Sequence, residues 1–317
     1  MKIVQNIKIS NFLLQSGEVS KINLSFQTFG LPIGMAPIVL VNHALTGNSN
    51  VAGEKGWWNN VVGENKVIDT KKYTIIAFNI PGNGYDEVSE NLIENYKSYT
   101  TKDIASLFWK GLEYFKINQL FAVIGGSLGG AIAWEMTFIK PNAIQNLVPI
   151  ATNWKANDWL IGNVLVQDAI LNNSKNPIHD ARLHAMLLYR SPESLTAKFN
   201  SERNDNQNSY KVESWLLHHG EKLTSRFELS AYKLMNHLLK TIDENTTKKD
   251  LQDFAKISPT KIHQIAVNSD YFFAPNENVK THNLLSNLKK NLTYHEINSI
   301  HGHDAFLMEY ERLNNIL

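Results

Sequence analysis

Leu120-Phe-Ala-Val-Ile-Gly-Gly-Ser-Leu-Gly-Gly130 joins a short apolar run to a cluster of glycines. The apolar run predicts a buried strand, and the residues that follow, up to Met136, predict a helix. Between them, Gly125-Gly-Ser-Leu-Gly129 fits the pattern G-x-S-x-G, in which a sharp strand-to-helix turn leaves no space for side chains beside the serine. We therefore predict that Ser127 is a nucleophile that presents its hydroxyl in the open. The alternative is a glycine-rich turn in which Ser127 only caps the helix.

Strand and helix patterns alternate on both sides of this turn. Residues 37–42, 73–79 and 144–150 are short, apolar and rich in β-branched side chains, as strands covered on both faces are. Residues 102–116 place apolar side chains at helical spacing. This alternation predicts a mostly parallel α/β sheet with right-handed crossovers. Residues 1–30 alternate apolar and polar side chains, which predicts an antiparallel entry to the sheet.

A long helical segment interrupts the strand pattern. Amphipathic helical stretches replace strands at residues 159–171, 180–189, 210–219 and 227–242. Strand patterns return at residues 261–267 and 292–297. We therefore expect a core domain made of residues 1–152 and 254–317, with residues 153–253 inserted as a helical lid over the sheet edge where ligands bind. With the serine turn, this organisation predicts an α/β-hydrolase fold.

Composition excludes several classes of protein. The 317 residues, 43% of them hydrophobic, suffice for a large core, which excludes disordered and collagen-like chains. Lys and Arg total 31 against 30 Asp and Glu, so a net charge of +1 provides no general attraction for nucleic acid or anionic membranes. The lack of cysteine excludes disulfides, thiolate metal sites and a cysteine nucleophile. No secretion signal or long apolar run is present, so we expect a cytoplasmic protein.

A serine nucleophile needs a base and a carboxylate that orients the base. In this fold the three residues follow one another in the order serine, acid, histidine. Asp270 follows the strand predicted at residues 261–267, and His303 follows the strand predicted at residues 292–297. We therefore predict that Ser127, Asp270 and His303 form a catalytic triad.

Eleven histidines compete for the role of the base. His301, two positions from His303, is the principal rival. A metal site built from His301, His303 and Asp304 is a further alternative, but no additional ligand pattern supports it, and we expect no metal.

The oxyanion formed during attack needs two backbone amide donors. One is expected from Leu128, directly after the nucleophile. The other is expected from the loop at residues 42–47, with the amide of Leu45 favoured and that of Ala44 as the near alternative. We expect His43 to support this loop rather than to act as a base.

Segments spread along the chain resemble homoserine O-acetyltransferases. They are His43–Gly47 with Val51–Gly53 and Trp57-Trp58, Gly125–Gly130, Ala181-Arg182 with Tyr189–Ser191, Val212–Leu216 with Arg226-Phe227 and Ser230–Tyr232, Ser269-Asp270, and Gly302–Leu307. The matches keep their order through the core and the lid. The resemblance implies an enzyme of methionine biosynthesis that uses acetyl-CoA as a co-substrate and has no bound cofactor. It also implies a possible homodimer through the lid helices.

The resemblance further implies roles for individual residues. Ser127 would accept the acetyl group from acetyl-CoA, and the hydroxyl of homoserine would then attack the acyl-enzyme in a ping-pong reaction. Arg182 and Asp304 would hold the carboxylate and the amine of homoserine, because a zwitterion in a dry pocket needs one fixed charge of each sign. The alternatives are a salt bridge within the lid for Arg182 and a loop-capping role for Asp304.

Three segments depart from the family pattern: the loop Ile80–Asp86, the short stretch between Ile170 and Ala181, and Ala131–Trp134 in the helix after the nucleophile. Because such segments shape the pockets, succinyl-CoA as donor and serine as acceptor remain alternatives. An esterase that uses water as acceptor is a second class of function, and a catalytically inactive binding protein is a third.

Overall fold

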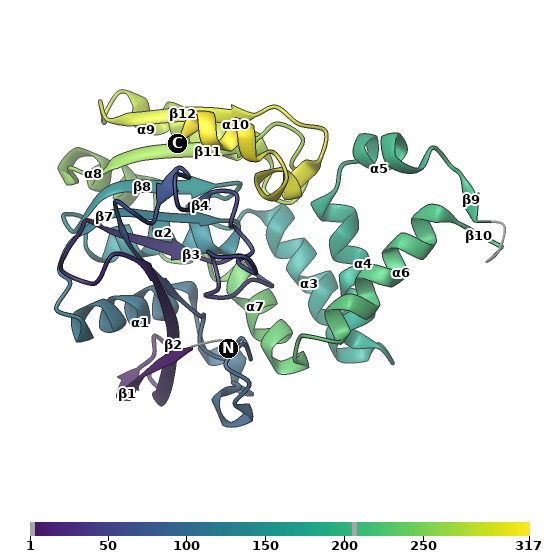
Figure 1. Ribbon diagram of the computed structural model, residues 1–317, viewed down its shortest axis with the longest axis horizontal. Coiled ribbons are helices and arrows are strands. Elements are labelled where there is room, and N and C mark those ends of the chain that lie inside the picture. Colours follow the sequence, from purple (N-terminus) through teal and green to yellow (C-terminus); the bar gives the residue numbers. More distant parts are fainter. Residues whose placement is uncertain (1–3, 205–207) are drawn as a thin grey trace.

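The computed structural model describes residues 4–204 and 208–317 and shows a twisted sheet flanked by helices, with a group of helices beside it (Figure 1). The sheet has eight strands in the order β1-β2-β6-β3-β7-β8-β11-β12. These strands are β1 (Gln5–Leu13), β2 (Val19–Gly30), β3 (Ile38–Asn42), β6 (Thr74–Phe78), β7 (Leu120–Gly126), β8 (Ile144–Ile150), β11 (Lys261–Val267) and β12 (Leu292–Ile297). Two further short pairs are β4 (Val62–Gly63) with β5 (Ile68–Asp69) and β9 (Arg203–Asn204) with β10 (Ser209–Tyr210).

The pairing directions confirm the predicted sheet. Within the large sheet, β6, β3, β7, β8, β11 and β12 pair in parallel with their neighbours. At the other edge, β1 pairs with β2, and β2 with β6, in antiparallel fashion. The predicted antiparallel entry is therefore present, although residues 1–3 of that prediction lie outside the described residues. Alternate side chains of a strand point to opposite faces, so Leu40 and Val41 of β3 belong to the two different apolar clusters that cover the sheet.

The helices match the predicted periodic segments to within a few residues. They are α1 (Thr101–Tyr114), α2 (Leu128–Ile139), α3 (Asp158–Asn173), α4 (Pro177–Tyr189), α5 (Pro192–Phe199), α6 (Lys211–Thr224), α7 (Leu229–Lys240), α8 (Lys248–Ile257), α9 (Pro275–Ser286) and α10 (Tyr310–Ile316), with 3-10 turns η1 (Ser89–Asn91), η2 (Tyr96–Ser98) and η3 (Gly302–Leu307). The sequence analysis missed α5, α8, α9 and α10. None of the helices in the described part of the chain has the length and apolar composition needed to cross a membrane.

The lid consists of helices α3 to α7. Helices α3 to α6 project beside the sheet, and α4 packs against both α3 and α6 (Figure 1). Helix α7 joins the lid to the core, since its Leu234, Met235 and Leu238 side chains are fully buried in the large apolar cluster. Helix α8 belongs with the core, because Phe254 packs edge-on against Phe138 of α2 with ring centroids 5.1 Å apart. The expected division at residue 253 therefore falls inside a helix, and the lid ends by packing at about the end of α7.

Candidate active site

Ser127 lies at the turn between β7 and α2 in a strained backbone conformation, with φ +55° and ψ −128°. The turn depends on glycine, since a Cβ atom on Gly129 would lie 2.4 Å from the carbonyl oxygen of Asn42. The Ser127 side chain makes no capping hydrogen bond to α2, in contrast to the alternative of a simple N-cap. One expectation is wrong: the residue is only 3% exposed, because the lid and η3 cover the edge of the sheet.

The structure brings the three predicted triad residues together. Ser127 Oγ lies 2.9 Å from His303 Nε2, and His303 Nδ1 lies 2.7 Å from Asp270 Oδ2. The second carboxylate oxygen of Asp270 accepts hydrogen bonds from the amides of Phe272 and Phe273, at 2.7 and 2.8 Å. These two amides fix the carboxylate, so His303 donates through Nδ1 and can accept the serine proton at Nε2.

Aromatic rings surround the imidazole of His303. The rings of Tyr189, Phe272, Phe273 and Phe306 have centroids 5.2 to 5.7 Å from the imidazole centroid. Such rings exclude water and limit rotation of the imidazole. The sequence analysis assigned none of them to the site, although Phe272 and Phe273 follow Asp270 in a short turn that an aspartate commonly stabilises.

His301 does not reach the nucleophile. Its Nδ1 atom lies 3.2 Å from Ser194 Oγ and 3.4 Å from Arg190 Nη2, so it contacts the lid. In the metal alternative His303 would be the central ligand, but both of its ring nitrogens already have hydrogen-bond partners in the triad. Hydrogen bonding therefore favours the triad over both alternatives.

The loop that follows β3 is held against the nucleophile turn by buried polar contacts. His43 Nδ1 donates to the carbonyl of Ala44 at 2.8 Å, and His43 Nε2 accepts from the amide of Ile80 at 2.9 Å. Burial lowers the pKa of His43 from 6.5 to about 4, so the ring is neutral at physiological pH. Asn42 Nδ2 donates to the carbonyl of Gly129 at 3.2 Å. His43 thus occupies the supporting position expected for it.

This arrangement brings the start of the loop after β3 against the nucleophile turn. Leu128 is the first residue of α2, where an amide has no acceptor within the helix. Ala44 and Gly47 close a turn through a 2.9 Å hydrogen bond, with the buried Leu45 between them. The choice between the Leu45 and Ala44 amides as the second oxyanion donor stays a prediction.

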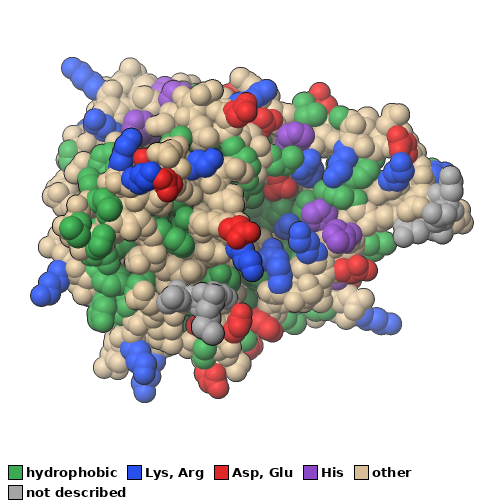
Figure 2. Space-filling model, in the orientation of Figure 1, with side chains coloured by type: hydrophobic (Ala, Val, Ile, Leu, Met, Phe, Trp, Pro, Cys, Tyr) green, Lys and Arg blue, Asp and Glu red, His purple; other side chains and the backbone are tan. Residues whose placement is uncertain are grey.

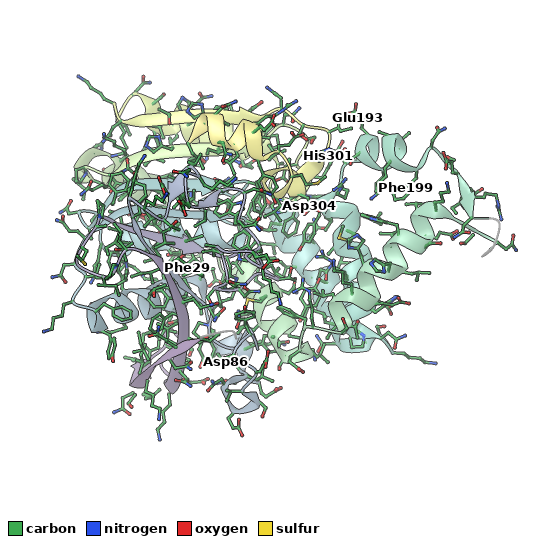
Figure 3. The ribbon with its side chains drawn as sticks, in the orientation of Figure 1. Phe29, Asp86, Glu193, Phe199, His301 and Asp304 are labelled. Atoms are coloured by element: carbon green, nitrogen blue, oxygen red, sulfur yellow. The ribbon has the colours of Figure 1, made fainter. Side chains whose placement is uncertain are left out.

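Arg182 and Asp304 lie close to the triad but do not form an ion pair with each other. The guanidinium of Arg182 lies 5.4 Å from the centroid of the Tyr189 ring, which in turn contacts His303. Burial raises the pKa of Asp304, and the positive charge of Arg182 acts in the opposite direction. Figure 3 places Asp304 at the junction of core and lid. Across residues 4–204 and 208–317, no carboxylate lies within 4 Å of the Arg182 guanidinium, which disfavours a lid salt bridge.

Comparisons with known proteins identify the family. The family described as alpha/beta hydrolase fold matches residues 37–299. A homoserine O-acetyltransferase from Cyclobacterium marinum is 32% identical to this chain, over 96% of the chain and 91% of the relative. The chain belongs to the homoserine O-acetyltransferase family. It is therefore an acyltransferase with the α/β-hydrolase fold, which confirms the predicted fold class, the enzyme class and the resemblance.

Solved structures share this fold across different activities. A homoserine O-acetyltransferase from Bacillus anthracis superposes with a TM-score of 0.86 at 18% identity, covering 99% of this chain and 96% of its own. An acetylester hydrolase from Corynebacterium glutamicum superposes with a TM-score of 0.82 at 16% identity, covering 99% and 95%. Because the same fold serves a transferase and a hydrolase, the acceptor must be argued from the side chains of the site.

Proposed function

We propose that the protein transfers an acetyl group from acetyl-CoA to the side-chain hydroxyl of homoserine by a ping-pong mechanism. The observation that carries the proposal is the continuous hydrogen-bonded relay from Ser127 through His303 to Asp270. Such a relay raises the nucleophilicity of a serine hydroxyl, which at its ordinary pKa attacks thioesters poorly. The acyl-CoA is a substrate, and the relay needs no bound cofactor.

In the first half-reaction, Ser127 Oγ attacks the thioester carbonyl while His303 Nε2 takes the serine proton. The negative charge that develops on the carbonyl oxygen is stabilised by the amides of Leu45 and Leu128. The C–S bond then breaks, and the leaving CoA sulfur takes the proton from His303. The product of this half-reaction is acetylated Ser127.

In the second half-reaction, the hydroxyl of homoserine attacks the acetyl-enzyme. His303 takes the proton of that hydroxyl and returns it to Ser127 as the ester bond to the enzyme breaks. Asp270 remains ionised and stabilises the imidazolium that forms in both halves. A single histidine therefore serves as base and acid twice in each cycle.

The acceptor pocket supports an amino-acid alcohol. Arg182 offers a guanidinium to the carboxylate of the acceptor, and Asp304 offers a carboxylate to its ammonium group. Burial raises the pKa of Asp304, so a bound ammonium would supply the positive charge that favours its ionised form. The aromatic rings around His303 and the low exposure of Ser127 reduce attack by water.

A hydrolase with water as acceptor is the second candidate, because the C. glutamicum acetylester hydrolase shares the fold. Thiol release from acetyl-CoA separates the candidates when it is followed with and without homoserine. Release that depends on homoserine supports transfer, whereas fast ester cleavage that is indifferent to homoserine supports hydrolysis. Parallel reactions with serine and with succinyl-CoA identify the acceptor and the donor.

We also propose a homodimer formed through the lid. Large apolar side chains are exposed there, including Ile161 (41%) and Leu165 (68%) on α3, Leu187 (50%) on α4 and Leu217 (47%) on α6. Apolar side chains gathered on one lobe are typical of interfaces between subunits. Sedimentation of the wild-type protein and of Leu165→Glu should show a dimer and a monomer, respectively. A cytoplasmic location stays a prediction.

A further inference from the structure

Cationic and aromatic side chains form a strip on the lid beside the triad. We call this the lid strip and define it as Arg182 of α4, Lys198 of α5, and Trp215, His219 and Lys222 of α6. Figure 2 shows lysine, arginine and histidine side chains gathered on the lid around the hollow between core and lid. In Figure 3, Phe199, the neighbour of Lys198, lies on the outer lid, away from Asp304. The strip therefore leads outward from the reaction centre.

Ring and charge contacts define the two ends of the lid strip. At the inner end, Arg182 contacts Tyr189, whose ring lies 5.5 Å from the imidazole of His303. At the outer end, the ammonium of Lys198 lies 4.9 Å from the ring centroid of Trp215, and that ring lies 4.4 Å from the ring of His219. Side chains from three helices thus contribute to the lid strip, and the charge of Arg182 at its inner end acts on His219 at its outer end.

The positive charges of Arg182, Lys198 and Lys222 all act on the ring of His219. Burial, followed by the charges of nearby cations, lowers the pKa of His219 from 6.5 to about 4. These cations are Arg182, His218, Lys222 and Lys198. Burial and the charge of Arg190 also lower the pKa of Lys198.

Lys211 of the lid forms an ion pair with Glu202, whereas the lysines of the lid strip have no such pair within the described residues. Within the described residues, no carboxylate lies within 4 Å of the side-chain nitrogens of Lys198 or Lys222. Uncompensated like charges held together repel one another, and a bound polyanion removes that repulsion. The strip is therefore suited to a ligand that carries several negative charges.

We propose that Lys198, His219 and Lys222 bind the phosphate groups of the acyl-CoA donor. This inference rests on the proposed function, since it assigns the remote part of the same substrate. CoA carries a pyrophosphate and a 3′-phosphate at one end and its thiol at the end of a slender uncharged arm. The phosphates lie on the outer lid, and the arm passes Arg182 and Tyr189 to bring the thioester to Ser127. Homoserine carries no phosphate and does not contact these three side chains.

Calorimetric titration of CoA tests the inference. Lys198→Ala and Lys222→Ala should each raise the Kd for CoA about fivefold, as expected for the loss of one partly exposed ion pair, and the effect should shrink at high salt. Lys175→Ala, which removes an exposed lysine from the turn between α3 and α4, is the matched control and should leave the Kd unchanged. Equal Kd values for all four proteins would overturn the inference.

Pantetheine, 3′-dephospho-CoA and inorganic pyrophosphate identify the group that is bound. Pantetheine has no phosphate, so its Kd should be the same for the wild type and both strip variants. Dephospho-CoA lacks the 3′-phosphate, so its Kd should not change when the lysine that contacts that phosphate is replaced by alanine. Inorganic pyrophosphate should displace CoA only at concentrations well above that of CoA. Displacement at equal concentrations would show that the strip binds free phosphate groups as well as it binds CoA, which would contradict a site for the whole donor.

Turnover distinguishes this inference from the proposed function. Each protein is assayed with acetyl-CoA and with S-acetylpantetheine as donor. Compared with the wild type, Lys198→Ala and Lys222→Ala should have a lower kcat/KM for acetyl-CoA relative to their kcat/KM for S-acetylpantetheine. If this ratio is unchanged and homoserine is still acetylated, the phosphate-binding role of the lid strip is wrong and the proposed function stands. If CoA binding depends on Lys198 but neither donor supports acetyl transfer, the proposed function is wrong and the phosphate-binding role of the lid strip is supported.

Discussion

Arg226 of the lid donates a hydrogen bond through Nη1 to the carbonyl oxygen of Thr46, at 3.2 Å and across 180 residues of sequence. The contact joins the turn between α6 and α7 to the loop that is proposed to supply an oxyanion donor. Burial and the charge of Arg182 lower the pKa of Arg226. The lid therefore touches the catalytic loop as well as covering it.

Removal of this contact should slow the reaction more than it destabilises the fold. For Arg226→Ala we expect kcat to fall about tenfold, because small displacements of an oxyanion donor are costly. The free energy of unfolding should change by less than about 1 kcal/mol, since the hydrogen bond lies at an exposed position. Steady-state kinetics and urea unfolding measure the two quantities, and Lys233→Ala on α7 is a control. An unchanged kcat would contradict the role of the contact.

The neutral His43 should make stability depend on pH. Its pKa is about 4 in the folded protein against 6.5 ordinarily. Between these values the unfolded chain binds a proton that the folded protein does not, so the free energy of unfolding should rise with pH, by up to about 3 kcal/mol. His43→Gln removes the titrating ring, and urea unfolding at pH 4 to 7 should show that this rise is lost. A variant curve with the same pH dependence as the wild-type curve would contradict the assignment.

Glu135 should produce the opposite slope. Burial, followed by the charge of Asp243, raises its pKa from 4.5 to about 7. The folded protein then holds a proton that the unfolded chain releases, so the free energy of unfolding should fall as pH rises from 4.5 to 7, again by up to about 3 kcal/mol. Glu135→Gln keeps an acceptor for the Thr101 hydroxyl and the Asp243 amide and should remove this fall.

The His43 and Glu135 slopes oppose each other over an overlapping pH range, so the wild-type curve alone does not reveal either one. Each single variant exposes the other group. The double variant should lose both contributions and keep the rise with pH that His219 and His237 produce, because burial lowers their pKa values to about 4 as well. A double variant with the same pH dependence as Glu135→Gln alone would contradict the role of His43.

Much of the core and the triad could be predicted from sequence. The glycines around Ser127 report a backbone constraint that few other residues satisfy, and the apolar strands report burial on both faces. Asp270 and His303 were found because each follows a strand of the sheet. These signals are local in the sequence. Because parallel strands with right-handed crossovers end at the same edge of the sheet, the signals also predict which residues lie close together.

The remaining site features depend on contacts between distant segments. The ring of Tyr189 and the hydrogen bond of Arg226 reach the site only because the lid folds back over the sheet. The burial of Ser127 has the same cause. Helix α5 was missed because its few buried positions, Ser194 and Phe199, leave no clear period in the sequence. No pattern in one chain predicts how a lid helix is placed on its core.

Arg182 should matter more for transfer than for hydrolysis. Arg182→Ala removes the proposed partner of the acceptor carboxylate, so kcat/KM for homoserine should fall at least about a hundredfold. Cleavage of a simple acetyl ester by water should fall far less, because water has no carboxylate to bind. Both rates are measured on the same preparation, with Lys175→Ala as the control. Equal losses in the two reactions would place Arg182 in the general stability of the site.

The formation of an acetyl-enzyme on Ser127 is the central claim, and mass spectrometry of the intact protein after brief exposure to acetyl-CoA tests it most directly. The account predicts a mass increase of one acetyl group, mapped to the peptide that contains Ser127, which disappears when homoserine is added and never forms in Ser127→Ala. Homoserine acetylation that continues in the Ser127→Ala protein, or an acetyl group found on a different residue, would contradict it.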